Sequence, residues 1–445
     1  MALTHRRAPG LSRSLTVVAG VAATAIALAG CSGSGGDGGD ASGAPSGDLE
    51  ILVSSASASD AAFTAISDAF EKKYPDVKVT LSTVSNDNYP ATKSSRLTAG
   101  NVDIIVVKNF VEVPDFAKDS TSDDVLLARA GGLVDLTDED FMSHYTPSVL
   151  ETQAIDGKQY AVPTGLSYST GVYYNKAIFE KYGLEVPTTW PELEKVMSTL
   201  KNEGVTPFGI GGKDSWPAGL AMLGAVGSEY PTAADKNALV EGLWKNTVAL
   251  TDDKPQSILD KTEEIFQNAQ KNFAGTGYDQ IPAGFARGDY AMTIDGTWNE
   301  PTIESAVDGA FDVGYFPLPA ADDAADNAFL NGKIELQLAV SSGAKNKTAA
   351  LAWLDFFSDP ANYKTFLEKS GFSSAQPDIA ATPFLESIAK YTSTFQPAWD
   401  TLWIANNKAG QDAVFPFNYP ALTPLGSDDA SQAAAAAQKA WSAAF

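Results

Sequence analysis

The order of strands and helices in residues 48–107 most constrains the fold. Apolar runs predict strands at 48–55, 77–84 and 103–107, and the segments between them, 59–75 and 88–100, have helical spacing. This β-α-β-α-β order favours a doubly wound α/β sheet with helices on both faces. Ligands of such sheets bind beyond the carboxyl ends of the strands.

Two segments follow those strand ends and are expected at a cleft, Ser54 to Ser59 and Lys108 to Phe110. The alternative is that both are ordinary connecting loops. Further along, 188–204 predicts a surface helix with a capping box made by Thr189 and Glu192.

The start of the chain has the pattern of a secretory signal. Three arginines precede the uncharged apolar run 15–30, which is too short for a confident membrane span. Residues 28–31, "LAGC", match the bacterial lipobox, so we expect residues 1–30 to be a lipoprotein signal peptide and Cys31 to be lipidated. An ordinary signal peptide with an incidental Cys31 is the alternative. Residues 31–47 are predicted to be a flexible tether.

Length and composition limit the remaining possibilities. The chain of 445 residues suits two lobes rather than one core, and its net charge of −24 disfavours nucleic acid as a partner. Cys31 is the only cysteine, and His144 is the only histidine outside the predicted signal. A histidine-rich zinc site is therefore excluded, and no metal or cofactor is expected. Hydrolysis by paired carboxylates needs neither residue type and stays open.

Three blocks of sequence carry a resemblance to a known family. They are 160–212, which contains "YYNKAIFEKYGLEVPTTWPEL", then 285–303, "FARGDYAMTIDGTWNEPTI", and 339–371. The chain closely resembles the extracellular solute-binding proteins of bacterial ATP-binding cassette (ABC) importers, in the carbohydrate-binding family that includes maltose-binding protein.

The resemblance implies a two-lobed periplasmic-binding-protein fold with a hinged cleft that holds a sugar. The chain is expected to cross between the lobes near 162–165 and 316–323. The predicted first lobe comprises 48–165 and 317–372, and the second comprises 166–316 and 373–445.

The same resemblance suggests the ligand-binding residues. Trp298 lies between the predicted strand 290–295 and a helix that begins near Pro301, where relatives place an aromatic ring against a sugar; a core tryptophan is the alternative. Tyr168 and Trp216 are candidates that could instead pack in the interior. Of Trp399 and Trp403 at least one is expected in the core, with Trp399 favoured as the ligand contact. The remaining candidates are Asp214 and Asn109, whose amide suits a sugar hydroxyl.

These features predict a monomeric, non-enzymatic protein that is lipid-anchored at the outer face of the cytoplasmic membrane. It would capture a sugar or oligosaccharide and deliver it to the permease of an ABC transporter. One alternative is a secreted glycoside hydrolase that uses Asp295 and Glu300. Another is a sensor or adhesin on the same fold, although the tripeptide 287–289, "RGD", needs only a tight turn at Gly288.

Overall fold

The computed structural model describes residues 44–445. The predicted signal peptide, Cys31 and most of the predicted tether lie outside the described residues. Within 44–445, no helix is long and apolar enough to span a membrane.

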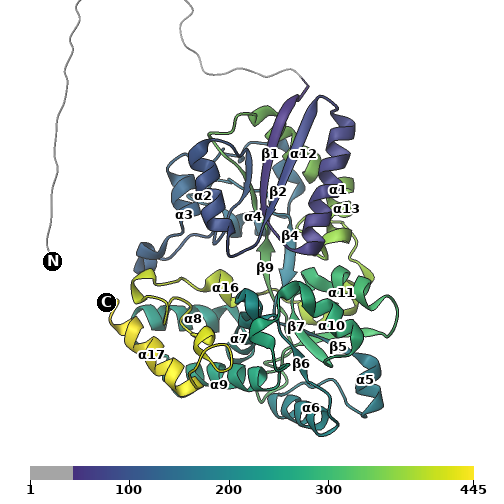
Figure 1. Ribbon diagram of the computed structural model, residues 1–445. Helices are drawn as coiled ribbons and strands as arrows, with labels where there is room; N and C mark the ends of the chain where they lie inside the picture. The colour runs from purple at the N-terminus through teal and green to yellow at the C-terminus, as the bar shows by residue number, and fades with distance from the viewer. Residues whose placement is uncertain (1–43) are drawn as a thin grey trace, which may run out of the picture. The chain divides into compact units, whose positions relative to one another are not determined.

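Four strands form the sheet of the first lobe, in the order β10-β3-β1-β2 (Leu338–Val340, Ile104–Val106, Gly47–Ser54, Val77–Val84). β1 runs parallel to β2 and β3, which confirms the predicted β-α-β-α-β order. The helices of this lobe are α1 (Ser57–Lys73), α2 (Tyr89–Ala99), α3 (Asp123–Arg129), α4 (Pro147–Gln153), α12 (Lys347–Ser358) and α13 (Pro360–Ser370). Figure 1 shows α1 and α13 on one side of the sheet and α2 and α3 on the other.

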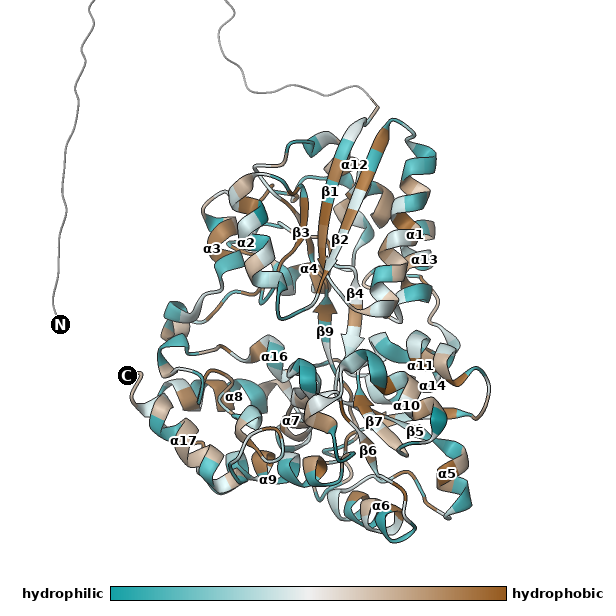
Figure 2. Ribbon diagram, in the orientation of Figure 1, coloured by the Kyte–Doolittle hydropathy of each residue, from teal (hydrophilic) through white to brown (hydrophobic). Residues whose placement is uncertain are grey.

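Position in the sheet explains the apolar patterns of two strands. The central strand β1 buries four consecutive residues, Ile51 to Ser54, because helices cover both of its faces. β2 lies at the edge and alternates between covered and exposed positions. In Figure 2 the strands of this sheet are accordingly rich in hydrophobic residues, whereas the outer helix surfaces are mostly hydrophilic.

The start of β1 is fastened to a distant helix. Asn346 donates from Nδ2 to the carbonyl oxygens of Ser46 (2.8 Å) and Asp48 (3.0 Å). Its Oδ1 accepts from Ala349 N and so caps the first turn of α12. The amino-terminal end of β1 is therefore tied to the first turn of α12.

The sheet of the second lobe has the order β6-β7-β5-β8 (Phe208–Gly209, Met292–Asp295, Gly171–Asn175, Val313–Pro317). β5 is antiparallel to both of its neighbours. The helices are α5 (Lys176–Lys181), α6 (Trp190–Asn202), α7 (Trp216–Glu229), α8 (Ala233–Trp244), α9 (Asp253–Gln267), α10 (Ile281–Arg287), α11 (Glu300–Val307), α14 (Pro383–Ser387), α15 (Ala389–Thr392), α16 (Trp399–Leu402) and α17 (Ala430–Ser442).

A third, small sheet lies between the two larger ones (Figure 1). It has the order β11-β9-β4 (Gln396–Pro397, Asn331–Glu335, Gly165–Tyr168), with β4 antiparallel to β9. β4 begins next to the predicted crossing at 162–165, and β8 ends inside the predicted crossing at 316–323. The residue limits predicted for the two lobes stay predictions.

Short 3₁₀ helices complete the fold, and two of them, Thr297–Asn299 and Tyr419–Ala421, contribute residues to the cavity described below. They span Asp115–Ser120, Asp140–His144, Gly212–Asp214, Phe273–Gly275, Tyr278–Gln280, Thr297–Asn299, Asn407–Ala409 and Tyr419–Ala421.

The predicted helix at 188–204 is confirmed as α6, but its capping box is only half formed. Thr189 Oγ1 accepts from Glu192 N at 3.4 Å, as predicted. The Glu192 carboxylate instead accepts from the backbone and hydroxyl of Thr188, at 2.7 and 2.9 Å. The reciprocal bond has thus moved one residue toward the amino terminus, because Thr188 offers two donors to the same oxygen.

Candidate functional site

A cavity of about 310 Å³, called the cleft below, lies between the lobes. This volume is near the lower limit of the range for small-molecule pockets, roughly 300 to 1,000 Å³. Its walls come from segments after β1, β2 and β3, from the region of β7 and α7, and from β9 and α16. The residues on which the site depends are Ser54, Ser55, Ser59, Asn86, Lys108, Trp216, Trp298, Lys333, Glu335, Trp399, Asp400, Trp403, Phe415 and Tyr419.

The first-lobe wall is polar. Lys108 Nζ donates to Ser54 Oγ (2.9 Å) and to Asn86 Oδ1 (3.1 Å). Ser54 ends β1, and Asn86 and Lys108 come just after the ends of β2 and β3, so the parallel order of these neighbouring strands brings the three residues together. Burial lowers the pKa of Lys108 to about 8, and the carboxylate of Glu335 partly opposes that shift. Hydroxyl, amide and ammonium groups therefore face the cavity from this side.

The second-lobe wall is aromatic and rests on a buried hydrogen-bond chain. Trp298 Nε1 donates to Tyr278 Oη (2.9 Å), and Tyr278 Oη donates to Asp295 Oδ1 (3.2 Å). Asn299 Nδ2 donates to the other carboxylate oxygen of Asp295 at 2.6 Å. Burial raises the pKa of Asp295 to about 7. Only 9% of Trp298 is exposed, so this ring is held firmly at the junction of β7 and α11.

Two other tryptophans are less buried than Trp298. Trp216 is half-buried and packs on Tyr278 at 4.6 Å and on Trp298 at 6.4 Å between ring centroids. Trp403 is also half-buried, and it stacks on Trp399 at 5.7 Å with a 20° angle between the rings. Trp399 itself is 1% exposed. Trp216 and Trp403 therefore offer more free ring surface to the cavity than Trp298 or Trp399.

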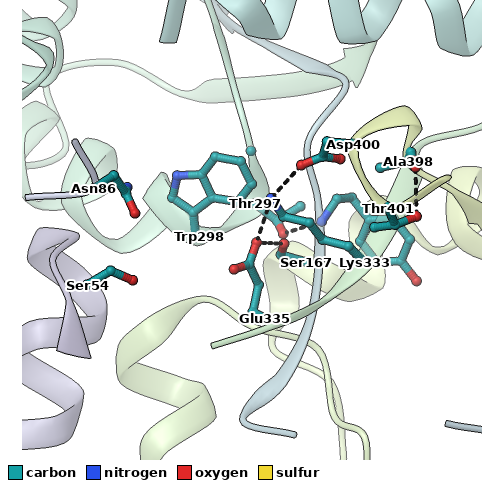
Figure 3. Close-up of polar contacts among 12 residues, drawn as sticks. Ser54, Asn86, Ser167, Thr297, Trp298, Lys333, Glu335, Ala398, Asp400 and Thr401 are labelled. Atoms are coloured by element: carbon teal, nitrogen blue, oxygen red, sulfur yellow. Dashed lines mark hydrogen bonds and ion pairs between the residues drawn. The ribbon is translucent and has the colours of Figure 1, made fainter. Parts of the chain in front are cut away.

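Lys333 and Glu335 of β9 and Asp400 of α16 form an ion cluster (Figure 3), and all three line the cavity. Lys333 Nζ lies 2.9 Å from Asp400 Oδ2, 3.5 Å from Glu335 Oε1 and 5.7 Å from the centre of the Trp298 ring. Ser167 Oγ donates to Glu335 Oε1 at 2.6 Å. Burial alone would lower the pKa of Lys333, but the carboxylates of Asp400 and Glu335 more than offset it and hold that pKa above its usual value.

The structure brings together some of the predicted site residues and separates others. Trp298, Trp216 and Trp399 line this cavity, whereas Asn109 lines a neighbouring one of about 280 Å³. Neither Tyr168 nor Asp214 is among the lining residues of either cavity. Tyr168 is 6% exposed in a separate apolar cluster, and Asp214 Oδ2 accepts from Tyr278 N at 2.5 Å.

Of the two predicted loops, the first contributes Ser54, Ser55, Ala56 and Ser59 to the cavity, and the second contributes Lys108. Lys333, Glu335 and Asp400 were not predicted. Lys333 and Glu335 alternate along a short strand, which places them on one face, but nothing in the sequence indicates what that face meets.

The carboxylates suggested for a hydrolase do not face a common cavity. Asp295 lies behind Trp298 with both oxygens hydrogen-bonded. Glu300 lines another cavity, of about 260 Å³, where burial and then the nearby Glu304 raise its pKa to about 7. Among residues 44–445 no group of three or more His, Cys, Asp and Glu side chains could hold a metal ion.

Comparison with known proteins gives one consistent result. The family model described as "Bacterial extracellular solute-binding protein" matches residues 54–364. The multiple sugar-binding protein of Streptococcus mutans is 25% identical over 70% of this chain and 71% of that protein. The melibiose/raffinose/stachyose-binding protein MelE of Bacillus subtilis is 22% identical over 77% and 78% of the two chains.

Solved structures agree with the fold. The solute-binding protein RafE in complex with raffinose superimposes with a TM-score of 0.69 at 24% identity, over 89% of this chain and 99% of that one. A sugar transporter from Bacillus licheniformis in complex with stachyose gives 0.69 at 18% identity, over 89% and 100%. The predicted two-lobed α/β fold is thereby confirmed.

Proposed function

Because the chain belongs to the family of bacterial extracellular solute-binding proteins, we propose that it captures a sugar or oligosaccharide between its lobes. It then delivers this ligand to the permease of an ABC importer. The observation that carries the proposal is the cavity between the lobes, which has aromatic rings on one wall and hydroxyl, amide and ammonium groups on the other.

Sugars present two kinds of surface, and the two walls suit them. The C–H faces of a sugar ring pack on aromatic rings, for which Trp216 and Trp403 offer the freest faces, and the more buried Trp298 also lines the cavity. Sugar hydroxyls both donate and accept hydrogen bonds. The Ser54 hydroxyl and the Asn86 amide can do both in return, and the Lys108 ammonium can donate. The names of the relatives, which include sugar-binding proteins, support the same ligand class.

The finer parts of the proposal concern where and how the protein works. We propose that Cys31 is lipidated and holds the monomeric protein at the outer face of the cytoplasmic membrane, as "LAGC" and the extracellular family suggest. We also propose that it performs no catalysis, since Asp295 and Glu300 face different surroundings. Changing Cys31 to Ala should release the protein to the medium or leave the precursor unprocessed. Continued lipid modification of that variant would contradict the anchor.

The central experiment is a thermal-shift screen with mono-, di- and oligosaccharides, followed by calorimetry and by analysis of the recovered sugar. A ligand at a hundredfold excess over its Kd should stabilise the protein by about 2.7 kcal/mol. The sugar should be recovered unchanged. Failure of every sugar to bind would overturn the proposed ligand class, and appearance of cleavage products would favour the hydrolase.

A further inference from the structure

The neighbouring cavity of about 280 Å³ shares a wall with the cleft. Six residues line both cavities, so only one layer of side chains separates them. These residues are Lys108, Lys333, Glu335, Leu336, Asp400 and Trp403. The rest of the second cavity comes from the end of β3 and the segment after it, from Thr152 of α4, from β9 and the residues after it, and from the segments around β11.

The shared wall carries two ammonium groups and two carboxylates. Lys333 is bonded to Asp400 and lies beside Glu335, and Lys108 completes the set. The charges on this wall balance, so it presents polar groups to a ligand without net attraction for an anion or a cation. A neutral ligand that spans both cavities would therefore meet polar groups but no net charge on this wall.

An exposed aromatic ring stands in each cavity. Within 44–445 the exposed large apolar residues are Phe116, Leu126, Phe395, Phe415 and Phe445. Phe415, which is 43% exposed, lines the cleft, and Phe395, which is 47% exposed, lines the second cavity. Both cavities thus combine a free ring with nearby polar groups.

Two features set the lining of the second cavity. A Cβ atom at Gly332 would lie 2.9 Å from the Phe395 ring and 2.9 Å from the Tyr168 ring, so glycine at this point of β9 lets Phe395 approach the strand. Asn109 is exposed and has the left-handed φ of 48°, which asparagine tolerates well. Its amide offers both a donor and an acceptor to a ligand.

We propose that the second cavity is a subsite for the distal rings of a neutral oligosaccharide whose first rings occupy the cleft. The ligand crosses the wall at Lys333, places a ring face on Phe395 and hydrogen-bonds to Asn109. This inference rests on the proposed sugar-binding function and extends it: the preferred ligand is longer than a disaccharide.

Calorimetry with melibiose, raffinose and stachyose, which have two, three and four rings, tests this inference, with chito-oligosaccharides of two to five units as a second series. Wild-type affinity should rise from the short to the long member of the series that binds. Phe395→Ala removes about 40 to 60 Å² of covered ring, which lowers affinity for the longest member about five- to tenfold and leaves the two-ring member unchanged. Asn109→Gly, which keeps the left-handed backbone, should act in the same direction.

Phe116→Ala is the matched control, because Phe116 is 38% exposed and lines neither cavity. It should leave both affinities unchanged, and all three variants should keep the wild-type melting temperature within a few degrees. Equal losses for short and long sugars in Phe395→Ala, or a wild-type affinity that does not rise beyond two rings, would overturn the subsite alone. Absence of wild-type binding in both series would overturn the proposed function with it.

Discussion

The two walls of the cleft are built on different principles. The first-lobe wall consists of small polar side chains and Lys108, carried by loops that follow parallel strands. The second-lobe wall consists of large rings whose positions depend on the buried chain from Trp298 through Tyr278 to Asp295. Substitutions in the two walls should therefore have different effects. Those in the first-lobe wall should alter mainly sugar affinity, and those in the second-lobe wall should alter both sugar affinity and folding stability.

The sharpest test of the second wall is Trp298→Ala. Because only 9% of this residue is exposed, truncation should cost about 3 to 5 kcal/mol of folding free energy and also lower sugar affinity at least about tenfold. Trp244→Ala is a matched control, since Trp244 is also 9% exposed and its Nε1 also donates a hydrogen bond, yet it lies outside the cleft. Chemical denaturation and calorimetry should show equal destabilisation in both variants and an affinity loss in Trp298→Ala alone. Wild-type affinity in Trp298→Ala would remove this ring from the site.

The buried carboxyl beneath the second wall should make stability depend on pH. The pKa of Asp295 is about 7 in the folded protein against 3.8 for the free side chain, so the folded state holds a proton that the unfolded chain releases. The stabilising contribution is full below about pH 4 and is lost as pH rises to about 7, and it amounts to on the order of 4 kcal/mol. Denaturation between pH 4 and 7 should show a flatter profile for Asp295→Asn. An unchanged profile would contradict the shift.

Glu300→Gln is the companion variant. Burial, and then Glu304, raise the pKa of Glu300 to about 7 from 4.5, so its contribution has the same sign as that of Asp295 and is lost between about pH 4.5 and 7. Since Glu300 is not among the residues that line the cleft, this variant should flatten the stability profile while sugar affinity stays at the wild-type value.

Trp216→Ala separates binding from stability within the aromatic wall. This ring is half-buried, and a sugar that covers a third to a half of it gains roughly 1.5 to 3 kcal/mol. Affinity should fall about ten- to a hundredfold, with a smaller loss of melting temperature than in Trp298→Ala, and Trp216→Phe should recover part of it. Calorimetry should give the highest affinity for the wild type, a lower one for Trp216→Phe and the lowest for Trp216→Ala. An unaltered Kd in Trp216→Ala would show that the sugar lies elsewhere.

The smallest effect is expected from the first wall. Lys108→Met removes an ammonium that holds Ser54 and Asn86 at the cavity, and a hydrogen bond to a charged group is worth about 1.5 to 3 kcal/mol at most. Affinity should fall about tenfold with little change in melting temperature, whereas Lys245→Met, at the exposed residue that follows α8, should change neither. Wild-type affinity should also decline as pH rises through about 8, where Lys108 loses its proton. A pH-independent affinity would exclude Lys108 from ligand contact.

The sequence predicted the first wall better than the rest of the site. Periodicity alone located the strands whose ends carry Ser54 and Lys108, because parallel strands must present those ends at one edge. Trp298 was predicted from the family resemblance and not from a sequence pattern. β7 is antiparallel to its neighbour β5, so the rule that parallel strands end at one edge of a sheet does not apply between them. The strand and helix on either side of Trp298 are confirmed as β7 and α11.

The ion cluster could not be predicted because its members meet only in the folded chain. Asp400 reaches Lys333 across 67 residues of sequence, and neither residue type is unusual in its own segment. Asn109 shows the other limit: it lies after the predicted strand as expected, but its loop opens into the neighbouring cavity. Loop direction depends on what packs against the loop, and spacing does not encode it.

The fastening of residues 46–48 by Asn346 has a mechanical consequence. A pull on the chain from its amino-terminal side acts first on β1, the central strand, which is hydrogen-bonded on both edges. A load directed along β1 strains the hydrogen bonds from β1 to β2 and β3 together, in shear, instead of breaking them one at a time. The elements of the second lobe make none of these contacts with β1, so the load is borne first by the sheet of the first lobe.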